Sequence, residues 1–213
     1  MPGLAARVHL ATAAMSLALL AAGAVRAAEV DNCTALDPGI AECGDFSDLG
    51  TLEFDLSLLG AANVGLEVQT SAGERSNGTL IFRAFLFNDS YLVEGEEIDF
   101  AQVELQLSGG ARFETIGTVR NFDFEPVTVM SPEAELARLS PAPPLPPTDL
   151  LEIGALDPEV PGAVDWEIDI SQLAATGFVL RIVAVPEPGV LASRAGAALV
   201  LGMLAARAAR RRR

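Results

Sequence analysis

Four acidic residues fall within six consecutive positions near the middle of the chain: Glu94, Glu96, Glu97 and Asp99. Carboxylate oxygens are the hard donors that Ca²⁺ takes in proteins. No Asp-x-Asp-x-Asp-Gly loop accompanies these residues, so a solvated acidic turn is the alternative interpretation. They are the calcium-ligand candidates of the sequence, with Asp45 and Asp48 as a second pair. No other cofactor is expected.

The residue types exclude several classes of enzyme. The chain has no lysine, and its single histidine, His9, lies in the N-terminal leader described below. Nucleophilic catalysis by a Ser-His-Asp, Cys-His or Ser-Lys arrangement is therefore not expected, and no glycine-rich phosphate-binding loop is present. We expect a protein that is not an enzyme. A glycosidase stays open as an alternative, because a pair of carboxylates is enough for that reaction.

The elements that would position these residues are strands. Apolar and polar residues alternate with period two in four segments: 51–59, 64–70, 163–170 and 178–185. In the third segment the predicted inward set is Val164, Trp166, Ile168 and Ile170. Segment 79–88 is apolar on both faces, which predicts a central strand covered on both sides. The turn at 71–78 ends in Asn77-Gly78, a strong hairpin signal.

The remaining segments carry more irregular patterns. The parity of the apolar positions shifts within 94–107, which predicts a β-bulge near 101–102. Segment 112–125 predicts one or two strands with Phe113, Phe122 and Phe124 in the core. Segment 131–162 contains eight prolines, so we expect a proline-rich surface loop there, with a short helical turn at 133–139. Together these patterns predict an all-β fold, an antiparallel β-sandwich of jelly-roll type.

The body, residues 28–185, is strongly acidic. It holds 28 of the 29 acidic residues and six of the 14 arginines, a net charge of −22. Such a surface repels nucleic acid and anionic lipid, so neither is an expected partner. Cys33 and Cys43 are the two cysteines, and in an exported chain they are expected to form a disulfide that closes a loop within 28–50.

The N-terminus has the features of an export signal. Arg7 precedes an apolar run from about residue 10 to 25, and Val25 and Ala27 meet the small-residue rule for cleavage. We expect a signal peptide at 1–27, removed after Ala27 by signal peptidase. An uncleaved N-terminal anchor is the alternative.

The C-terminus has three parts. Val185-Pro186-Glu187-Pro188 is followed by a small apolar run at 189–206 and by the basic residues Arg207, Arg210, Arg211, Arg212 and Arg213. A helix over the 18 residues of 189–206 would be roughly 27 Å long, close to the ~30 Å of a bilayer core. The terminal arginines would then lie in the cytoplasm. A basic amphipathic helix that binds nucleic acid is the alternative, and the export signal and the acidic body argue against it.

These three parts, in this order and paired with a signal peptide, resemble the PEP-CTERM sorting signal of Gram-negative bacteria. The resemblance covers about residues 185–213. It implies that Pro186, Glu187 and Pro188 are recognised by an exosortase, an integral membrane cysteine transpeptidase. Arg194 departs from the family's continuously apolar span. The resemblance implies an inner-membrane-anchored intermediate and then release to the cell surface or the extracellular biofilm matrix.

The sequence therefore predicts an exported surface or matrix protein whose body has no assigned role. The alternative is an extracellular carbohydrate-binding module, with or without Ca²⁺, that holds a polysaccharide. Such a module needs exposed aromatic side chains on a sheet face, and the single tryptophan, Trp166, has core parity.

Overall fold

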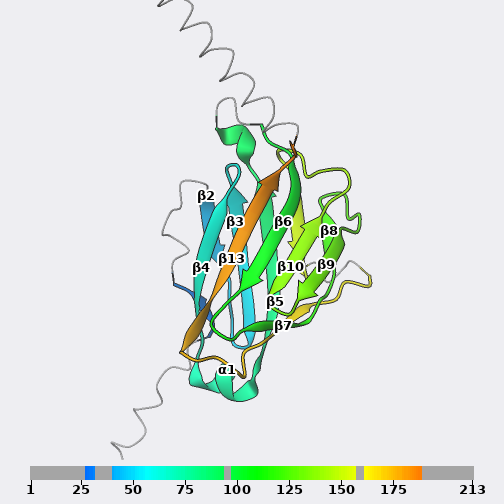
Figure 1. Cartoon of the computed structure of the whole chain (residues 1–213). Coiled ribbons are helices and arrows are strands. Elements are labelled where there is room, and N and C mark those ends of the chain that lie inside the picture. Colours follow the sequence, from blue (N-terminus) through cyan, green and yellow to red (C-terminus); the bar gives the residue numbers. More distant parts are fainter. Residues whose placement is uncertain (1–26, 32–39, 94–96, 157–160, 189–213) are drawn as a thin grey trace, which may run out of the picture.

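The computed structural model describes residues 27–31, 40–93, 97–156 and 161–188. Within them the chain forms two β-sheets packed face to face (Figure 1). The helical elements of the described residues are α1 (Ala72–Asn77) and the 3₁₀ turn η1 (Ser90–Leu92). The predicted all-β sandwich is thus confirmed in its class.

Sheet A has six strands in the order β1-β4-β13-β6-β10-β9. Their bounds are β1 Glu29–Val30, β4 Asn63–Gln69, β13 Gly177–Pro186, β6 Phe100–Leu107, β10 Leu136–Ser140 and β9 Thr128–Glu133. All neighbouring pairs in this sheet are antiparallel. The last strand of the body, β13, therefore lies in the middle of the sheet, paired with β4 on one side and β6 on the other.

Sheet B has seven strands. Five follow the order β2-β3-β5-β11-β8, and β12 pairs with both β5 and β7. Their bounds are β2 Ile40–Asp45, β3 Thr51–Leu58, β5 Thr79–Asn88, β11 Leu150–Ile153, β8 Val119–Asn121, β12 Trp166–Asp169 and β7 Arg112–Thr115. The long strand β5 is the centre of this sheet, as its apolar composition predicts.

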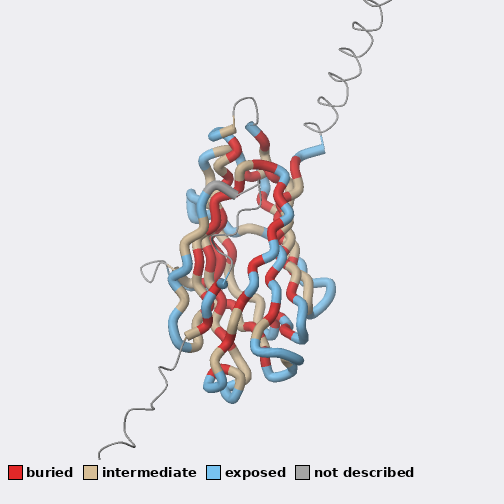
Figure 2. Tube along the Cα trace, turned by 90° about the vertical axis from the view of Figure 1, so that its left-hand side faces the viewer, coloured by how far each residue is buried: buried red, intermediate tan, exposed pale blue. Residues whose placement is uncertain are grey.

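The core lies between the two sheets and follows from strand periodicity. Successive side chains of a strand point to opposite faces, and β5 accordingly alternates between half-buried and buried along its whole length. Buried residues also occupy every second position of β4, of β13 and of β3 as far as Leu56. The colouring by burial shows buried and less buried residues alternating along the strands (Figure 2). The prediction that β5 is covered on both faces was wrong, because its outer row is only half-buried.

One strand pair departs from the predicted antiparallel arrangement. β3 and β5 pair in parallel over eight residue pairs. The chain between them passes through β4, which belongs to sheet A, and returns through α1 to sheet B. The predicted hairpin at Asn77-Gly78 was therefore wrong. Gly78 is instead the left-handed C-cap of α1, at φ 83°, a conformation that glycine adopts without steric cost.

The proline-rich segment 131–162 also differs from its prediction. It contains β10 and β11, and the predicted helical turn at 133–139 is the β9–β10 hairpin. Ala137 and Leu139 are buried in the core, while the prolines lie mainly in the connections. These segments form strands and not a loop or a helical turn, because each short strand pairs with a neighbour that is already in a sheet.

Other predictions concern single positions. The bulge near 101–102 is confirmed, since Val185 pairs with Gln102 and Pro186 with Phe100, which leaves Ala101 unmatched. Trp166, Ile168 and Ile170 are buried as predicted, whereas Val164 is 51% exposed because β12 begins only at Trp166. Phe122 and Phe124 are exposed, and the prediction that they are core residues was wrong.

Several predicted features fall outside the described residues: the leader up to residue 26, Cys33, and everything from residue 189 onward, including Arg207 and Arg210–Arg213. No helix in the described ranges has the length and apolar character needed to cross a membrane. The described part of the chain holds no free cysteine. Because Cys33 lies outside it, the Cys33–Cys43 disulfide stays a prediction.

Candidate binding surface on sheet B

The outer face of sheet B carries rows of side chains that cross several strands. In one row Asp55 of β3 is in register with Phe85 of β5, which is in register with Glu152 of β11. Their chain neighbours Phe54, Ala84 and Leu151 are buried in the core, so this row lies on the outer face of the sheet. Asp55 and Phe85 are half-buried there, and Glu152 is buried at 3% exposure. The next row contains Ser57, Phe87 and Leu150.

Phe85 and Phe87 form a ridge down the middle of this face. Their ring centroids are 6.0 Å apart and the rings are tilted by 42°. The ridge lies between two hollows, one over β8 and β11 and the other over β2 and β3. Two adjacent phenylalanines on an outer face leave apolar surface available for a ligand.

The aromatic hollow, over β8 and β11, has a volume of about 440 Å³. Its lining residues are Phe85, Asn121, Phe122, Asp123, Phe124, Leu150 and Glu152. Phe122 is 65% exposed and Phe124 is 55% exposed. An apolar hollow with a few polar groups, in this size range, is the usual form of a small-molecule site.

A tight turn holds the two phenylalanines outward. Asn121 Oδ1 accepts a hydrogen bond from the Glu125 N–H at 2.8 Å, and the Phe124 N–H donates to the Asn121 carbonyl at 2.9 Å. Asp149 fixes the other side, because its Oδ1 accepts from the Phe122 N–H at 3.1 Å. Phe124 lies at φ 60°, an uncommon and strained conformation for a bulky residue. Because Phe124 keeps this strained backbone while its ring is exposed, its role lies outside the core.

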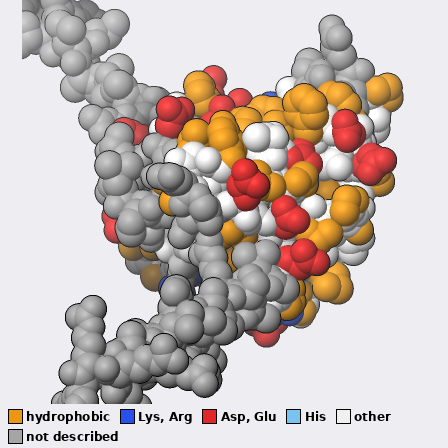
Figure 3. Space-filling model, turned by 90° about the horizontal axis from the view of Figure 1, so that it is seen from above, with side chains coloured by type: hydrophobic (Ala, Val, Ile, Leu, Met, Phe, Trp, Pro, Cys, Tyr) orange, Lys and Arg blue, Asp and Glu red, His pale blue; other side chains and the backbone are white. Residues whose placement is uncertain are grey.

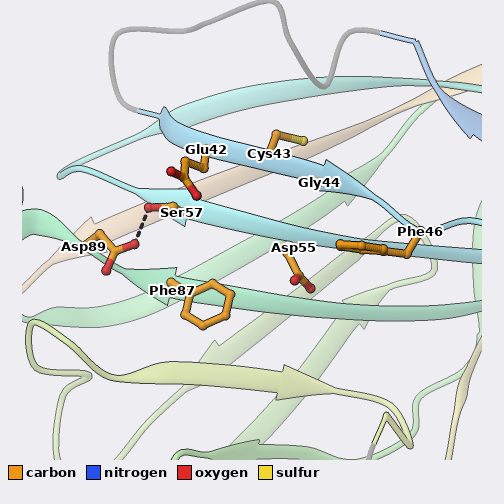
Figure 4. A pocket seen from close by; sticks show the side chains of 8 residues that line it. All are labelled: Glu42, Cys43, Gly44, Phe46, Asp55, Ser57, Phe87 and Asp89. Atoms are coloured by element: carbon orange, nitrogen blue, oxygen red, sulfur yellow. Dashed lines mark hydrogen bonds between the residues drawn. The ribbon is translucent and has the colours of Figure 1, made fainter.

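The second hollow, which we call the acidic hollow, has a volume of about 360 Å³ and is lined by Glu42, Cys43, Gly44, Phe46, Asp55, Ser57, Phe87 and Asp89 (Figure 4). Ser57 Oγ donates a hydrogen bond to Asp89 Oδ2. The ring of Phe46 lies so close to Gly44 that a Cβ there would come within 2.9 Å of it. Burial raises the pKa of Asp55, so this carboxylate is partly desolvated.

An ion pair stiffens the sheet beside the ridge. Arg83 of β5 donates from Nε and Nη2 to the two carboxylate oxygens of Asp165, both at 2.8 Å, and Glu53 lies 3.7 Å from Arg83 Nη1. The hydrogen bonds from Arg83 lower the pKa of Asp165 despite its partial burial. A bidentate pair of this kind fixes both side chains. This part of the outer face is therefore ordered in the absence of a ligand.

The residues predicted to form a sorting motif, 186–188, lie at the end of sheet A, away from α1 (Figure 1). Pro186 is buried as the last residue of β13 and pairs with Phe100. Glu187 and Pro188 are exposed, and the Glu187 N–H donates to the Asp99 carbonyl at 2.9 Å. At this end acidic side chains are interspersed with hydrophobic ones and few basic groups are visible (Figure 3).

The calcium candidates are only partly described. Glu94 and Glu96 lie outside the described residues, Glu97 is exposed and Asp99 is half-buried. Asp48 accepts a hydrogen bond from the Leu49 N–H, and Asp45 accepts from the N–H groups of Ser47 and of Val30, which lies on β1. Both carboxylates therefore have structural roles. In the part of the chain that the structure describes, no three His, Cys, Asp or Glu side chains lie together as a metal site. Calcium binding at these residues stays a prediction.

Sequence reasoning missed the aromatic hollow. The motif Asn121-Phe-Asp-Phe-Glu125 alternates aromatic and acidic residues, which is also the pattern of a half-buried strand. The signal that distinguishes the two is Pro126 directly after it, with Asn121 five residues earlier, because both favour a turn.

Comparisons of the chain with protein-family models, with curated proteins and with solved structures each found no match. Function is therefore inferred from the residues and their geometry.

Proposed function

We propose that this chain is a non-enzymatic exported protein of a Gram-negative bacterium. Signal peptidase removes residues 1–27, the body is a β-sandwich of jelly-roll type, and an exosortase acts on the signal at 186–213 during delivery to the surface or the extracellular matrix. The observation that carries the proposal is the order of Pro186-Glu187-Pro188, the apolar run and the terminal arginines, after an N-terminal leader.

The fold is compatible with this role. β13 ends at Pro186, so the body stops where the sorting motif begins and no linker separates them. Glu187 and Pro188 are exposed and accessible to an enzyme, whereas Pro186 is buried and pairs with Phe100 in sheet A. A test of sorting should therefore leave Pro186 in place.

Replacing Glu187 and Pro188 with alanine is expected to block processing with little effect on folding, since both side chains are exposed and surface substitutions usually change stability by about 0.5 kcal/mol or less. The unprocessed form should collect in the membrane fraction, and the surface and medium fractions should lose most of the protein. Mass spectrometry of each fraction measures both termini.

The matched control is Pro132→Ala with Glu133→Ala, another exposed proline–glutamate pair, on β9. It should be processed like the unaltered chain. Normal delivery of the Glu187→Ala, Pro188→Ala variant would refute the sorting proposal.

A second candidate function for the body is carbohydrate binding, and the aromatic hollow favours it. The C–H face of a sugar ring can stack on Phe122 or Phe124, while the side chains of Asn121 and Asp123 offer donors and acceptors to its hydroxyls. The exposed, strained Phe124 is the observation behind this proposal. The ligand would be an extracellular polysaccharide.

Removing the exposed rings is expected to abolish most of this binding. On a glycan array the Phe122→Ala, Phe124→Ala variant should bind its best oligosaccharide about tenfold more weakly, equivalent to about 1.4 kcal/mol. Tyr91→Ala, an exposed aromatic on η1 outside the hollow, should leave binding unchanged. A repeat in EDTA tests whether Ca²⁺ takes part. Failure of the unaltered protein to bind any glycan would dismiss this candidate.

Phe124→Gly separates binding from folding. Glycine removes the strain at φ 60°, so the variant should be at least as resistant to urea as the unaltered protein while its glycan binding falls. Equal loss of stability and binding would indicate a structural role instead.

A further inference from the structure

Glu74 is a buried carboxylate whose charge has no cationic partner in the described residues. The residue is 2% exposed, and none of the ion pairs among the described residues includes it. An isolated buried charge is costly unless it is paired and hydrogen-bonded. The fold keeps this one at the N-terminal turn of α1, where it is the N3 residue of a capping box with Ser71.

Three backbone N–H groups converge on the carboxylate. Oε1 accepts from Ala28 at 2.8 Å and from Gly50 at 3.0 Å, and Oε2 accepts from Ser71 at 2.8 Å. Burial alone would raise the pKa of Glu74, but these hydrogen bonds outweigh it and hold the pKa below its usual value. Glu74 is therefore ionised at neutral pH.

One of the three donors has a special position in the chain. Ala28 is itself 2% exposed, and it is the residue that follows the expected cleavage point after Ala27. The next residues are fixed as well, since Glu29 and Val30 pair with Gln69 and Val68 of β4 and the Val30 N–H donates to Asp45 Oδ2. The nitrogen of Ala28 is thus held in place on the Glu74 carboxylate.

We propose that cleavage after Ala27 completes this site: the new α-ammonium group of Ala28 forms a buried ion pair with Glu74 that locks the mature N-terminus into the fold. This inference rests on the proposed export. In the hydrolysis, the oxygen of water joins the Ala27 carbonyl carbon to give a carboxylate, and the Ala28 nitrogen leaves with the protons that make it –NH₃⁺. The hydrogen bond to the ionised Glu74 is already present before cleavage; the cut makes its donor cationic and so adds the attraction between opposite charges.

The ion pair can form only when cleavage falls after Ala27. A chain starting at Ala27 would carry its ammonium one residue, about 3.8 Å, away from the carboxylate, and a chain starting at Glu29 would lack the paired nitrogen altogether. The signal-peptidase cut must precede packing of this edge, because the Ala28 nitrogen is enclosed in the folded body.

The absence of lysine makes the test direct. The α-amino group is the single primary amine of the mature chain, so an amine-reactive ester labels nothing else. Chains 27–213, 28–213 and 29–213 are prepared in mild detergent by protease release from a fusion. Near neutral pH the 28–213 chain should be labelled about tenfold more slowly than either neighbour, since a one-unit rise in the pKa of the amine reduces its reactive form tenfold.

Glu74→Gln supplies the matched variant, because it keeps the size and an acceptor oxygen but removes the charge. It should raise labelling of the 28–213 chain to the rate of the 27–213 chain. N-acetylation of the 28–213 chain keeps an N–H donor but removes its positive charge, so it should increase the unfolding equilibrium constant about tenfold, the difference between a charged pair and a neutral donor on the carboxylate. It should have no such effect in Glu74→Gln. If circular dichroism shows that Glu74→Gln does not fold, the labelling rates of the three chain lengths decide whether the ion pair exists.

Equal labelling rates for the three chains would overturn the ion pair. Failure of export has a different signature: protein recovered from cells would still carry residues 1–27 by mass spectrometry, whatever the recombinant chains show.

Discussion

Trp166→Ala is expected to lower the free energy of unfolding by about 3–5 kcal/mol, the usual cost of removing a buried aromatic side chain. Trp166 is fully buried and meets Phe82 and Phe113 edge-on, with ring centroids 6.0 and 5.5 Å away. Its Nε1–H donates to the Thr118 carbonyl at 3.1 Å. Since domains of this kind have about 5–15 kcal/mol of stability in total, the variant should lose a large part of it.

Urea unfolding followed by far-UV circular dichroism measures this change, because the substitution removes the tryptophan fluorescence. Trp166→Phe is the matched control. It keeps an aromatic ring, and the Thr118 carbonyl still accepts from the Gly154 N–H at 2.9 Å, so a loss of about 1–2 kcal/mol is expected. A loss below about 1 kcal/mol for Trp166→Ala would show that the aromatic cluster is not the centre of the core.

Asn88→Ala is expected to destabilise the opposite end of β5 by about 2–3 kcal/mol, because two hydrogen bonds are lost inside the core. Asn88 is fully buried, and its Nδ2 donates to the carbonyls of Ile98 and Leu145 at 2.8 and 2.9 Å. Asn88 therefore connects the end of β5 to Ile98, just before β6, and to Leu145, which pairs with Phe100 at the start of β6. Hydrogen exchange should accelerate at the Glu187 amide, which bonds to the neighbouring Asp99 carbonyl.

Asn63→Ala provides the comparison. Asn63 is exposed on β4 and contacts Arg181, so its removal should change stability by about 0.5 kcal/mol or less. Similar effects of the two asparagine substitutions would contradict the buried role of Asn88.

The class of the fold is accessible from the sequence because strand alternation is a local signal. Leu52, Phe54, Leu56 and Leu58 alternate with polar residues and are all buried, and β4, β12 and β13 are found in the same way. The sheet to which each strand belongs is not a local signal. Nothing in the local pattern of 64–70 shows that this strand belongs to sheet A, so the parallel β3–β5 pair could not be predicted.

Short elements were mispredicted because their local signals are ambiguous. The capping box of α1, Ser71 with Glu74, is present in the sequence, but Asn77-Gly78 fits both a hairpin and a helix C-cap. Phe122 and Phe124 belong to a turn that Asn121 and Asp149 stabilise. Asp149 is remote in sequence, so the aromatic hollow emerges only once β8 and β11 are paired.

The position of β13 has a mechanical consequence. Its first residue, Gly177, and β1 both pair with Gln69, whereas its last residue, Pro186, lies at the other end of sheet A. A pull on the C-terminal tail acts along a central strand whose hydrogen bonds to β4 and β6 run perpendicular to the load. Those bonds must shear together instead of opening one at a time. A tail held as proposed above would therefore pull on the body through a central strand of sheet A.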